Sequence, residues 1–415
     1  MTIVGLGYVG LPLAQEAARS GIRVTGFDVS DRVVDGLMAG RSHVDDLDGR
    51  DVTRMLDDGF TATTDPAGLA ASDAIVICVP TPLSDDGAPD LSAVVGASET
   101  IAAHLRPGTL VVLESTTYPG TTDDVVRPVL EAGSGLTAGV DFHLAFSPER
   151  IDPGNAVYGI RNTPKVVGGH TEACTDRAVE LYERIVDTVV PTVGTREAEM
   201  AKLLENTYRH VNIALMNEMS VFCHDLGIDL WAAIEAAKTK PFGFQAFYPG
   251  PGVGGHCIPI DPNYLSHQVR TLGYQFRFVE LAQEISNRMP AYVVARVQET
   301  LNEVSKPMRG STVLVLGLTY KPDIADDRET PATAVIRHLR RLGADVVAHD
   351  PHLDAFSDDG RDVAMVDDLD AALRGCDMAL LLQTHSSYDL DEIAATAPMV
   401  FDTRGHMRHE NVRRL

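Results

Sequence analysis

The chain of 415 residues has few cysteines and no long apolar run, and each shortage excludes a class of protein. Its five cysteines are scattered, which argues against a disulfide framework and against a paired-cysteine metal site. No apolar run reaches the roughly 18 residues that a membrane span needs. The first strand-like run begins at Thr2, which leaves no room for a secretory signal. We therefore expect a cytoplasmic protein without a membrane partner.

Positive charge is also scarce, because 59 acidic residues outnumber 35 basic ones and give a formal net charge of −24. Such a balance disfavours binding to nucleic acid or to an anionic membrane surface. An anionic substrate would therefore need positive charge concentrated at its site, so the few basic residues become candidates for binding it. The lysines are Lys165, Lys202, Lys238, Lys240, Lys306 and Lys321.

Short β-branched runs alternate with helical patterns at both ends of the chain, whereas long helical patterns occupy the middle. Strands that alternate with helices are typical of parallel sheets. We predict an α/β fold with two Rossmann-like doubly wound domains joined by a central helical domain. The predicted domains are 1–193, 194–302 and 303–415, and a long connecting helix is expected from Ile285 to Val304, with Pro290 inside it.

A glycine-rich loop follows the first predicted strand and opens a helix. In dinucleotide-binding folds, three glycines at this spacing provide a tight turn, a close backbone approach to pyrophosphate and close helix packing. Asp28 ends the next predicted strand, where a carboxylate accepts bonds from the ribose hydroxyls of NAD and repels the phosphate of NADP. FAD, or glycines that serve only packing, are the alternatives. The predicted NAD-binding residues here are Gly5, Gly7, Tyr8, Val9, Gly10 and Asp28.

A second glycine-rich segment, GPGVGGHCIPIDP from Gly250 to Pro262, contains Cys257. Glycines permit positive φ and a close approach of backbone to ligand. A thiol in such a loop becomes a nucleophile if nearby positive charge or N–H groups lower its pKa. A small buried hydrophobic residue is the alternative for Cys257. No metal is implied, because His256 has no second ligand at the usual spacing.

Eight motifs, in order along nearly the whole chain, resemble the nucleotide-sugar 6-dehydrogenases. The segments KTKPFGFQAFYPGPGVGGHCIPIDPNYL and SPERIDPGN are most similar to the branch that oxidises UDP-N-acetylhexosamines, in particular UDP-N-acetylglucosamine. The resemblance implies NAD-dependent oxidation of a UDP-sugar to a UDP-uronic acid by a homodimer. The motifs are GLGYVGLPLA, CVPTP, ESTTYPGTT, SPER, AKLLEN, GPGVGGHCIPIDP, TYKPDIADDRETPA and FDTRG.

The chemistry of such a reaction agrees with these residues. Oxidising an alcohol to a carboxylate removes four electrons, so two hydrides must leave in sequence. A thiolate at Cys257 would hold the intermediate aldehyde as a thiohemiacetal and then as a thioester. The resemblance implies that Lys202 and Asn206 stabilise the oxyanion, and that Asp261 assists hydrolysis. A solvated helix face is the alternative for the first two, and a turn before Pro262 is the alternative for Asp261.

The resemblance also assigns the remaining site residues. Thr116 would bind water and cofactor, and Glu149 would act as a base or position water; a helix start or an ion pair with Arg150 is the alternative for Glu149. UDP-glucose dehydrogenases have a second glutamate where this chain has Pro153, which favours the N-acetylhexosamine branch. Pro80 and Thr81 are further predicted cofactor residues. The predicted substrate-binding residues are Glu149, Arg150, Lys202, Asn206, Gly254, Lys321 and Arg404, with Lys238 and Lys240 as weaker candidates.

Three rival functions remain open. The first is a two-electron dehydrogenase in which Cys257 is structural. The second is a catalytically silent protein that binds nucleotide sugars. The third is the same reaction on UDP-N-acetylmannosamine, UDP-N-acetylgalactosamine or UDP-glucose.

Overall fold

The computed structural model describes two compact units of the chain. One unit comprises Met1–Glu205 with Asn263–Tyr274, and the other comprises Asn206–Pro262 with Gln275–Leu415. The described residues are 1–44, 47–83, 88–152, 155, 157–255, 258, 261–358 and 360–415. Within them, no helix is long and apolar enough to cross a membrane.

The first unit is built on an eight-stranded sheet in the order β3-β2-β1-β4-β5-β6-β7-β8. Its strands pair in parallel, except that β7 runs antiparallel to β6. The predicted parallel sheet is thus confirmed for β1 to β6, whereas β7 and β8 run in the opposite direction, which the sequence pattern did not reveal. The strands are β1 (Thr2–Val4), β2 (Thr25–Phe27), β3 (Thr61–Thr63), β4 (Ala74–Ile77), β5 (Leu110–Leu113), β6 (His143–Phe146), β7 (Lys165–Gly169) and β8 (Val189–Pro191).

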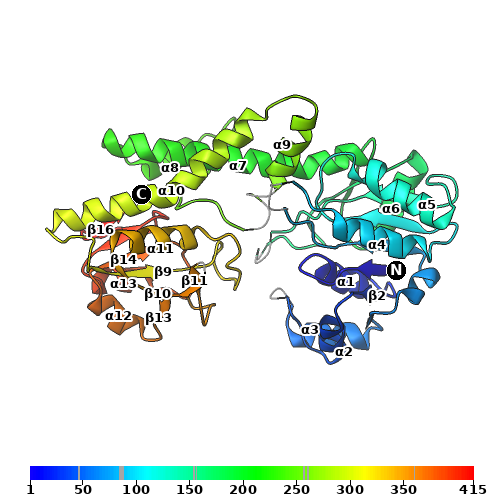
Figure 1. Cartoon of the computed structure of the whole chain (residues 1–415), viewed down its shortest axis with the longest axis horizontal. Coiled ribbons are helices and arrows are strands. Elements are labelled where there is room, and N and C mark those ends of the chain that lie inside the picture. The colour runs from blue at the N-terminus through cyan, green and yellow to red at the C-terminus, as the bar shows by residue number, and fades with distance from the viewer. Residues whose placement is uncertain are drawn as a thin grey trace. The chain divides into compact units, whose positions relative to one another are not determined.

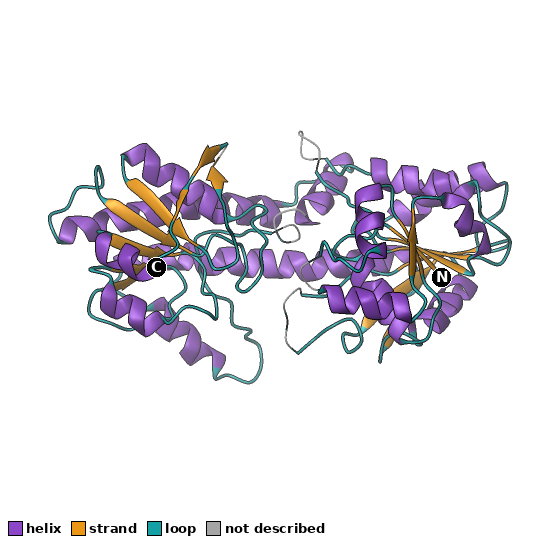
Figure 2. Cartoon of the chain, turned by 90° about the horizontal axis from the view of Figure 1, so that it is seen from below, coloured by secondary structure: helices purple, strands orange, loops and turns teal. Residues whose placement is uncertain are grey.

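Helices cover both faces of this sheet, as Figure 2 shows. Successive strand residues alternate between two apolar cores because side chains along a strand point to opposite faces. Ile3 packs in a core with α1, α2, α3 and α6, whereas Val4 packs with α4 and α5. The helical segments are α1 (Gly10–Arg19), α2 (Asp31–Met38), α3 (Gly49–Asp57), η1 (Pro66–Ala71), α4 (Ser92–Ala102), η2 (Thr122–Val126), α5 (Arg127–Ser134) and α6 (Glu172–Tyr182).

The second unit contains a six-stranded sheet in the order β13-β10-β9-β14-β15-β16, whose neighbouring strands are parallel. Helices α10 and α11 share a core on one face, and α12 and α13 share a core on the other. The doubly wound C-terminal fold is therefore confirmed (Figure 1). Its elements are β9 (Thr312–Leu316), α11 (Pro331–Leu342), β10 (Asp345–His349), β11 (Ser357–Asp358), β12 (Arg361–Asp362), β13 (Ala364–Met365), α12 (Leu369–Gly375), β14 (Met378–Leu381), α13 (Leu390–Thr396), β15 (Val400–Asp402) and β16 (Val412–Arg414).

Four further helices form the predicted helical middle of the chain: α7 (Thr195–Asp225), α8 (Leu230–Lys238), α9 (Asp261–Thr271) and α10 (Arg277–Glu303). The expected long helix exists as α10, which begins earlier than expected and continues through Pro290. Helix α7 is longer still, with 31 residues. The division into three domains at 193 and 302 remains a prediction.

The two sheets share one local arrangement. In the first unit, Gly5 turns out of β1 with a φ of 90°, and Asp28 accepts the N–H of Leu6 at 2.9 Å. In the second unit, Gly317 turns out of β9 with a φ of 78°, and Asp350 accepts the N–H of Leu318 at 2.6 Å. An acid at the end of the second strand therefore anchors the loop after the first strand in both units.

Candidate active site

The first glycine loop has the shape that a dinucleotide pyrophosphate needs. A Cβ on Gly10 would lie 1.9 Å from the carbonyl oxygen of Gly5, so the helix packs directly on the turn. A Cβ on Gly7 would meet no atom within 4 Å, so this glycine faces open space. The loop leads into the N-terminus of α1, and the positive end of a helix dipole attracts phosphate. These residues fit NAD, which would supply a hydride acceptor here.

Asp28 lies directly after β2 and is held by two backbone groups. Its carboxylate oxygens accept the N–H of Leu6 and the N–H of Ser30, each at 2.9 Å. The carboxylate is therefore fixed beside the glycine loop. Each carboxylate oxygen has two lone pairs, so the same group retains acceptor capacity for ribose hydroxyls. Tyr8 in the loop is exposed, whereas Val9 caps α1 and is partly buried.

The loops that follow β4 and β5 are linked by side-chain hydrogen bonds. Ser115 Oγ donates to the carbonyl of Val79 at 2.7 Å, and Thr81 Oγ1 donates to the carbonyl of Thr116 at 2.7 Å. Tyr264, a buried residue of α9, donates its hydroxyl to the carbonyl of Thr81. Because parallel strands end at one edge of the sheet, these loops lie at the edge where cofactors bind in such folds. Pro80, in the same loop, is exposed.

Glu149 follows β6 at this sheet edge. Its Oε1 accepts the N–H groups of Arg150 at 2.6 Å and of Ile151 at 2.7 Å. The guanidinium of Arg150 pairs instead with Glu205 of α7, at 2.6 and 3.2 Å. The structure therefore excludes the alternative that Glu149 is the ion-pair partner of Arg150.

Three buried side chains close to Glu149 form a cluster that the sequence did not predict, although Lys165 was named among the scarce basic residues. Lys165, Glu114 and Tyr182 lie together at the edge of the first sheet. Cys78 also lies here, and burial raises the pKa of its thiol well above its usual range. Cys78 is thus a packed neutral thiol. The scarcity of lysine was the available signal for Lys165, but nothing in its local sequence indicates a buried position.

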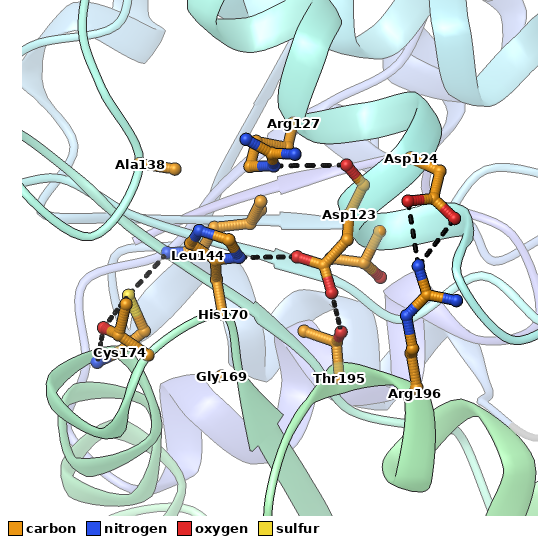
Figure 3. A network of polar contacts seen from close by, with 12 residues as sticks. Asp123, Asp124, Arg127, Ala138, Leu144, Gly169, His170, Cys174, Thr195 and Arg196 are labelled. Atoms are coloured by element: carbon orange, nitrogen blue, oxygen red, sulfur yellow. Dashed lines mark hydrogen bonds and ion pairs between the residues drawn. The ribbon is translucent and has the colours of Figure 1, made fainter.

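Helix α7 carries Lys202 and Asn206 one turn apart, as predicted. Its first turns are fixed to η2 by polar contacts, which Figure 3 shows. Oδ2 of Asp123 accepts the hydroxyl of Thr195, and Oδ1 of Asp123 lies 2.6 Å from Nδ1 of His170. Arg196 donates from Nη2 to both oxygens of Asp124, at 2.9 and 2.8 Å.

A buried acid, Glu199, continues this anchor one turn before Lys202. Its carboxylate accepts the N–H of Gly120 at 2.5 Å, the N–H of Thr122 at 2.9 Å and the hydroxyl of Thr122 at 2.7 Å. The residue is 1% exposed. Burial raises the pKa of Glu199 to about 7, against the lowering effect of these hydrogen bonds. The carboxyl group is therefore partly protonated at neutral pH.

We expect the stability of the protein to fall as pH rises from about 4.5, the pKa of an unfolded Glu199, through about 7. Over this range the folded state binds more protons than the unfolded state, so raising the pH favours unfolding, by roughly 3 kcal/mol for this group. Urea unfolding at pH 5 and pH 8 measures the effect. Glu199→Gln should lose this part of the pH dependence, whereas Asp124→Asn, which removes an exposed carboxylate nearby, should keep it. Equal pH dependence in wild type and Glu199→Gln would contradict the assignment.

In the second unit, two predicted catalytic residues meet directly. Asn206 Nδ2 donates to Oδ2 of Asp261 at 2.6 Å, and both side chains are buried. Asp261 is the first residue of α9 and immediately precedes Pro262, so it begins a helix and does not lie in the turn that was its alternative. Its carboxylate points to Asn206. The solvated helix face that was the alternative for Asn206 is excluded, because this residue is only 7% exposed.

The second glycine loop packs against the segment that follows β9. A Cβ on Gly254 would lie 2.8 Å from Cβ of Tyr320 and 2.9 Å from Cδ of Pro331. Gly255 has a φ of 83° and donates its N–H to the carbonyl of Arg328 at 3.2 Å. Lys321 comes directly after Tyr320, so it lies in the segment that packs against the second glycine loop. Cys257 lies outside the described residues.

Arg404 is positioned by contacts of the loop after β15. Asp402 Oδ1 accepts the N–H of Arg404 at 2.7 Å, and Arg404 Nε donates to the carbonyl of Leu382 at 2.7 Å. A Cβ on Gly250 would lie 3.0 Å from Nη1 of Arg404, which places the guanidinium beside the second glycine loop. Burial lowers the pKa of Arg404 to about 10, so the guanidinium stays charged at neutral pH.

Asp323, His352 and His385 have the donor types of a metal site, and their ligand atoms lie within 4.8 Å of one another. Both ring nitrogens of His385 are engaged, however. Its Nδ1 accepts the N–H of Asp323 at 3.0 Å, and its Nε2 lies 3.1 Å from Oδ2 of Asp350. These contacts engage both ring nitrogens of the buried His385. The cluster is explained as a polar network in which Asp323 and His352 are exposed.

Comparison with known proteins agrees with this geometry. The UDP-glucose/GDP-mannose dehydrogenase family matches through its NAD binding domain at residues 1–186, its central domain at 196–288 and its UDP binding domain at 314–409. A UDP-N-acetyl-D-glucosamine 6-dehydrogenase of Pseudomonas aeruginosa is 36% identical, over 86% of this chain and 83% of its own. A UDP-N-acetyl-D-mannosamine dehydrogenase of Pyrococcus horikoshii is 35% identical, over 94% of this chain and 90% of its own.

A solved structure of the UDP-N-acetyl-D-mannosamine dehydrogenase from Pyrococcus horikoshii is similar over the whole chain, with a TM-score of 0.89 and 33% identity. It covers 100% of this chain and 99% of its own. The fold, the cofactor loop and the family match thus agree on one assignment. The chain belongs to the UDP-glucose/GDP-mannose dehydrogenase family and is an NAD-dependent oxidoreductase.

Proposed function

We propose that the protein oxidises C6 of a UDP-N-acetylhexosamine, specifically UDP-N-acetylglucosamine, to the UDP-uronic acid. The observation that carries this proposal is the hydrogen bond of 2.6 Å between Asn206 and Asp261. These two residues come from separate motifs of the sequence, and Asp261 lies four residues after Cys257. Their buried contact supports a polar site beside the cysteine loop.

The reaction proceeds by covalent catalysis at Cys257. The C6 alcohol first loses a proton and a hydride, which leaves an aldehyde. The Cys257 thiolate adds to this aldehyde, and the resulting thiohemiacetal loses a second hydride to become a thioester. Water hydrolyses the thioester, releasing the carboxylate and the free thiol. NAD, held at the loop of Gly5, Gly7 and Gly10, would supply the acceptor for both hydrides, so one sugar would yield two NADH.

The polar residues take complementary roles in this scheme. Lys202 and Asn206 stabilise negative charge on the C6 oxygen, and the lysine also favours the thiolate. Asp261 assists the hydrolytic step through its contact with Asn206. Glu149 takes a proton from the attacking water, and Thr116 positions water and cofactor.

The UDP part of the substrate is assigned to the C-terminal domain, residues 303–415. Lys321 and Arg404 suit a diphosphate, the first as a point charge and the second as a planar fork. The position of Arg404 beside Gly250 supports this assignment, as does the packing of Gly254 on Tyr320. Arg150 contributes to substrate binding indirectly. Its ion pair with Glu205 orders the segment around Glu149.

Related proteins are named for different sugars, so the choice of sugar rests on the segments around the site residues. UDP-N-acetylglucosamine is preferred because the segments around Cys257 and Glu149 most resemble the dehydrogenases of that sugar. UDP-N-acetylmannosamine is the second candidate, since relatives named for it match more than 90% of this chain.

The test is a count of NADH formed per sugar consumed, with UDP-N-acetylglucosamine, UDP-N-acetylmannosamine and UDP-glucose compared at equal concentration. We expect two NADH per molecule and the highest kcat/KM for UDP-N-acetylglucosamine. One NADH per sugar would indicate an alcohol dehydrogenase that stops at the aldehyde. No NADH with any of these sugars would indicate a different substrate or a silent binding protein.

We also propose a cytoplasmic homodimer. Along α7 of the second unit, Tyr208, Leu215 and Phe222 recur every seven residues, with exposed fractions of 47%, 47% and 44%. Apolar side chains at this spacing form one stripe on a helix, and an exposed stripe is typical of an interface. Light scattering is expected to show twice the mass of one 44.7 kDa chain, and the mass of a single chain would contradict a dimer.

A further inference from the structure

Lys165 is a buried lysine shared by two carboxylates. Its side chain is 6% exposed, and its Nζ lies 3.1 Å from Oε2 of Glu114 and 3.8 Å from Oε2 of Glu149. A lysine is rarely buried to this extent without a partner, because removing its charge from water is costly. The two carboxylates explain why this one is buried.

Sheet topology brings the three residues together. Glu114 follows β5, and Glu149 follows β6, so both lie at the edge where these parallel strands end. Strand β7 is antiparallel to β6, and its first residue is Lys165. The start of β7 therefore lies at the same edge as the end of β6. The reversed direction of β7 therefore brings the lysine to this edge.

The lysine is held from its other side as well. Tyr182, the last residue of α6, donates its hydroxyl to Oε1 of Glu114, and Lys165 Nζ lies 5.1 Å from the centre of the Tyr182 ring. Burial alone would lower the pKa of Lys165, but Glu114 and Glu149 outweigh burial and raise it. Lys165 is therefore a fixed positive charge, and Cys78, the other titratable group facing it, is a neutral buried thiol.

The two oxygens of Glu149 have different surroundings. Oε1 accepts the N–H groups of Arg150 and Ile151, which fixes the orientation of the carboxylate. Oε2 faces Lys165 at 3.8 Å, which is too long for a hydrogen bond but close enough for strong attraction in a buried site. The lysine therefore orients Oε2 without using its lone pairs.

We propose that Lys165 is a positioning residue for the hydrolytic half of the reaction, which it serves by orienting Oε2 of Glu149 toward the attacking water. This inference rests on the proposed function. In that step the water oxygen bonds to the thioester carbon, and one water proton passes to Glu149. The C–S bond then breaks, and its electron pair leaves with the sulfur of Cys257. The step exchanges no electrons with the cofactor.

A double-variant comparison tests the proposal. Lys165→Met alone leaves Glu114 buried without its counter-ion, so that variant is expected to be unstable whatever the role of Lys165. Glu114→Gln removes this problem, and Lys165→Met is therefore added to Glu114→Gln and compared with Glu114→Gln alone. Lys165→Arg, which keeps the positive charge, is the conservative variant in the wild-type background.

Acid-quench mass spectrometry of the intact protein, with rapid measurement of NADH, separates the oxidation steps from hydrolysis. We expect the rate of the first hydride transfer to be the same within about twofold, and thioester hydrolysis to slow about a hundredfold when Lys165→Met is added. A covalent adduct on Cys257 should then accumulate. Lys165→Arg should hydrolyse the thioester at least about tenfold faster than the double variant.

Two results would overturn the proposal. Hydrolysis as fast in the double variant as in Glu114→Gln would mean that Lys165 serves only to neutralise Glu114. Equal slowing of hydride transfer and hydrolysis would mean general damage to the site. The wild type separates these results from failure of the proposed function: two NADH per sugar in the wild type with either result rejects only the role of Lys165, whereas one NADH rejects the proposed function itself.

Discussion

Cys257→Ala protein is expected to turn over at less than about one-thousandth of the wild-type rate, because removing a nucleophile closes the covalent route and leaves only binding and electrostatic effects. NAD binding should be unchanged, since the cofactor loop lies far from Cys257 in the sequence. Turnover is measured by NADH formation with UDP-N-acetylglucosamine, and NAD binding by fluorescence titration.

The matched control is Cys78→Ala. Cys78 is buried, and burial raises the pKa of its thiol well above its usual range, so it is a poor nucleophile. We expect this variant to keep activity within a few-fold of wild type. Two NADH per sugar from Cys257→Ala protein would rule out the thioester scheme and make Cys257 a structural residue.

Gly10→Ala is expected to destabilise the first unit and to abolish NAD binding. The new Cβ would lie 1.9 Å from the carbonyl oxygen of Gly5 and 3.1 Å from Cγ2 of Ile3. The backbone carbonyl of Gly5 cannot rotate away as a flexible side chain can, so α1 must move away from the turn. Overpacking of this kind costs about 1 to 3 kcal/mol. Urea unfolding and NAD titration measure the two effects.

Gly7→Ala is the matched variant in the same loop and should separate folding from binding. A Cβ at Gly7 meets no protein atom within 4 Å, so the free energy of unfolding should stay within about 0.5 kcal/mol of wild type. The methyl group would instead occupy space assigned to the pyrophosphate. Loss of one charge-assisted hydrogen bond corresponds to an affinity about tenfold to a hundredfold lower. If Gly7→Ala protein binds NAD as tightly as the wild type, the cofactor binds elsewhere. If Gly10→Ala protein is as stable as the wild type, the packing of α1 on the turn is contradicted.

Much of the fold was predictable because the strands leave local signals. The β-branched runs that became β1, β4 and β5 are buried on both faces, so their composition alone indicates central strands. Asn206 and Asp261 were predicted as site residues from two separate motifs. Their contact depends on the tertiary fold, which the motifs do not reveal. Strand direction was not predictable: β7 resembles its parallel neighbours in composition, and only its pairing with β6 reveals that it is reversed.

That reversal is also why the Lys165 cluster escaped prediction. Glu114 and Lys165 are 51 residues apart, and neither occurs at a spacing that indicates a site. A buried ion pair depends on tertiary contacts, which periodicity does not report. Glu199 escaped for a similar reason, because an acid in an amphipathic helix normally indicates a solvated face, whereas here it meets three donors from a distant loop.

The two related loops after β1 and β9 imply different sensitivities to side-chain substitution. In the first unit, α1 begins five residues after Gly5, so a phosphate bound there would face backbone groups at the start of a helix. In the second unit, α11 begins only at Pro331, fourteen residues after Gly317, and the charge beside the second glycine loop belongs to the side chain of Arg404. A backbone N–H remains when a side chain is replaced, whereas a guanidinium is lost. Under the proposed assignment, single side-chain substitutions would therefore weaken binding of the nucleotide sugar more readily than binding of the cofactor.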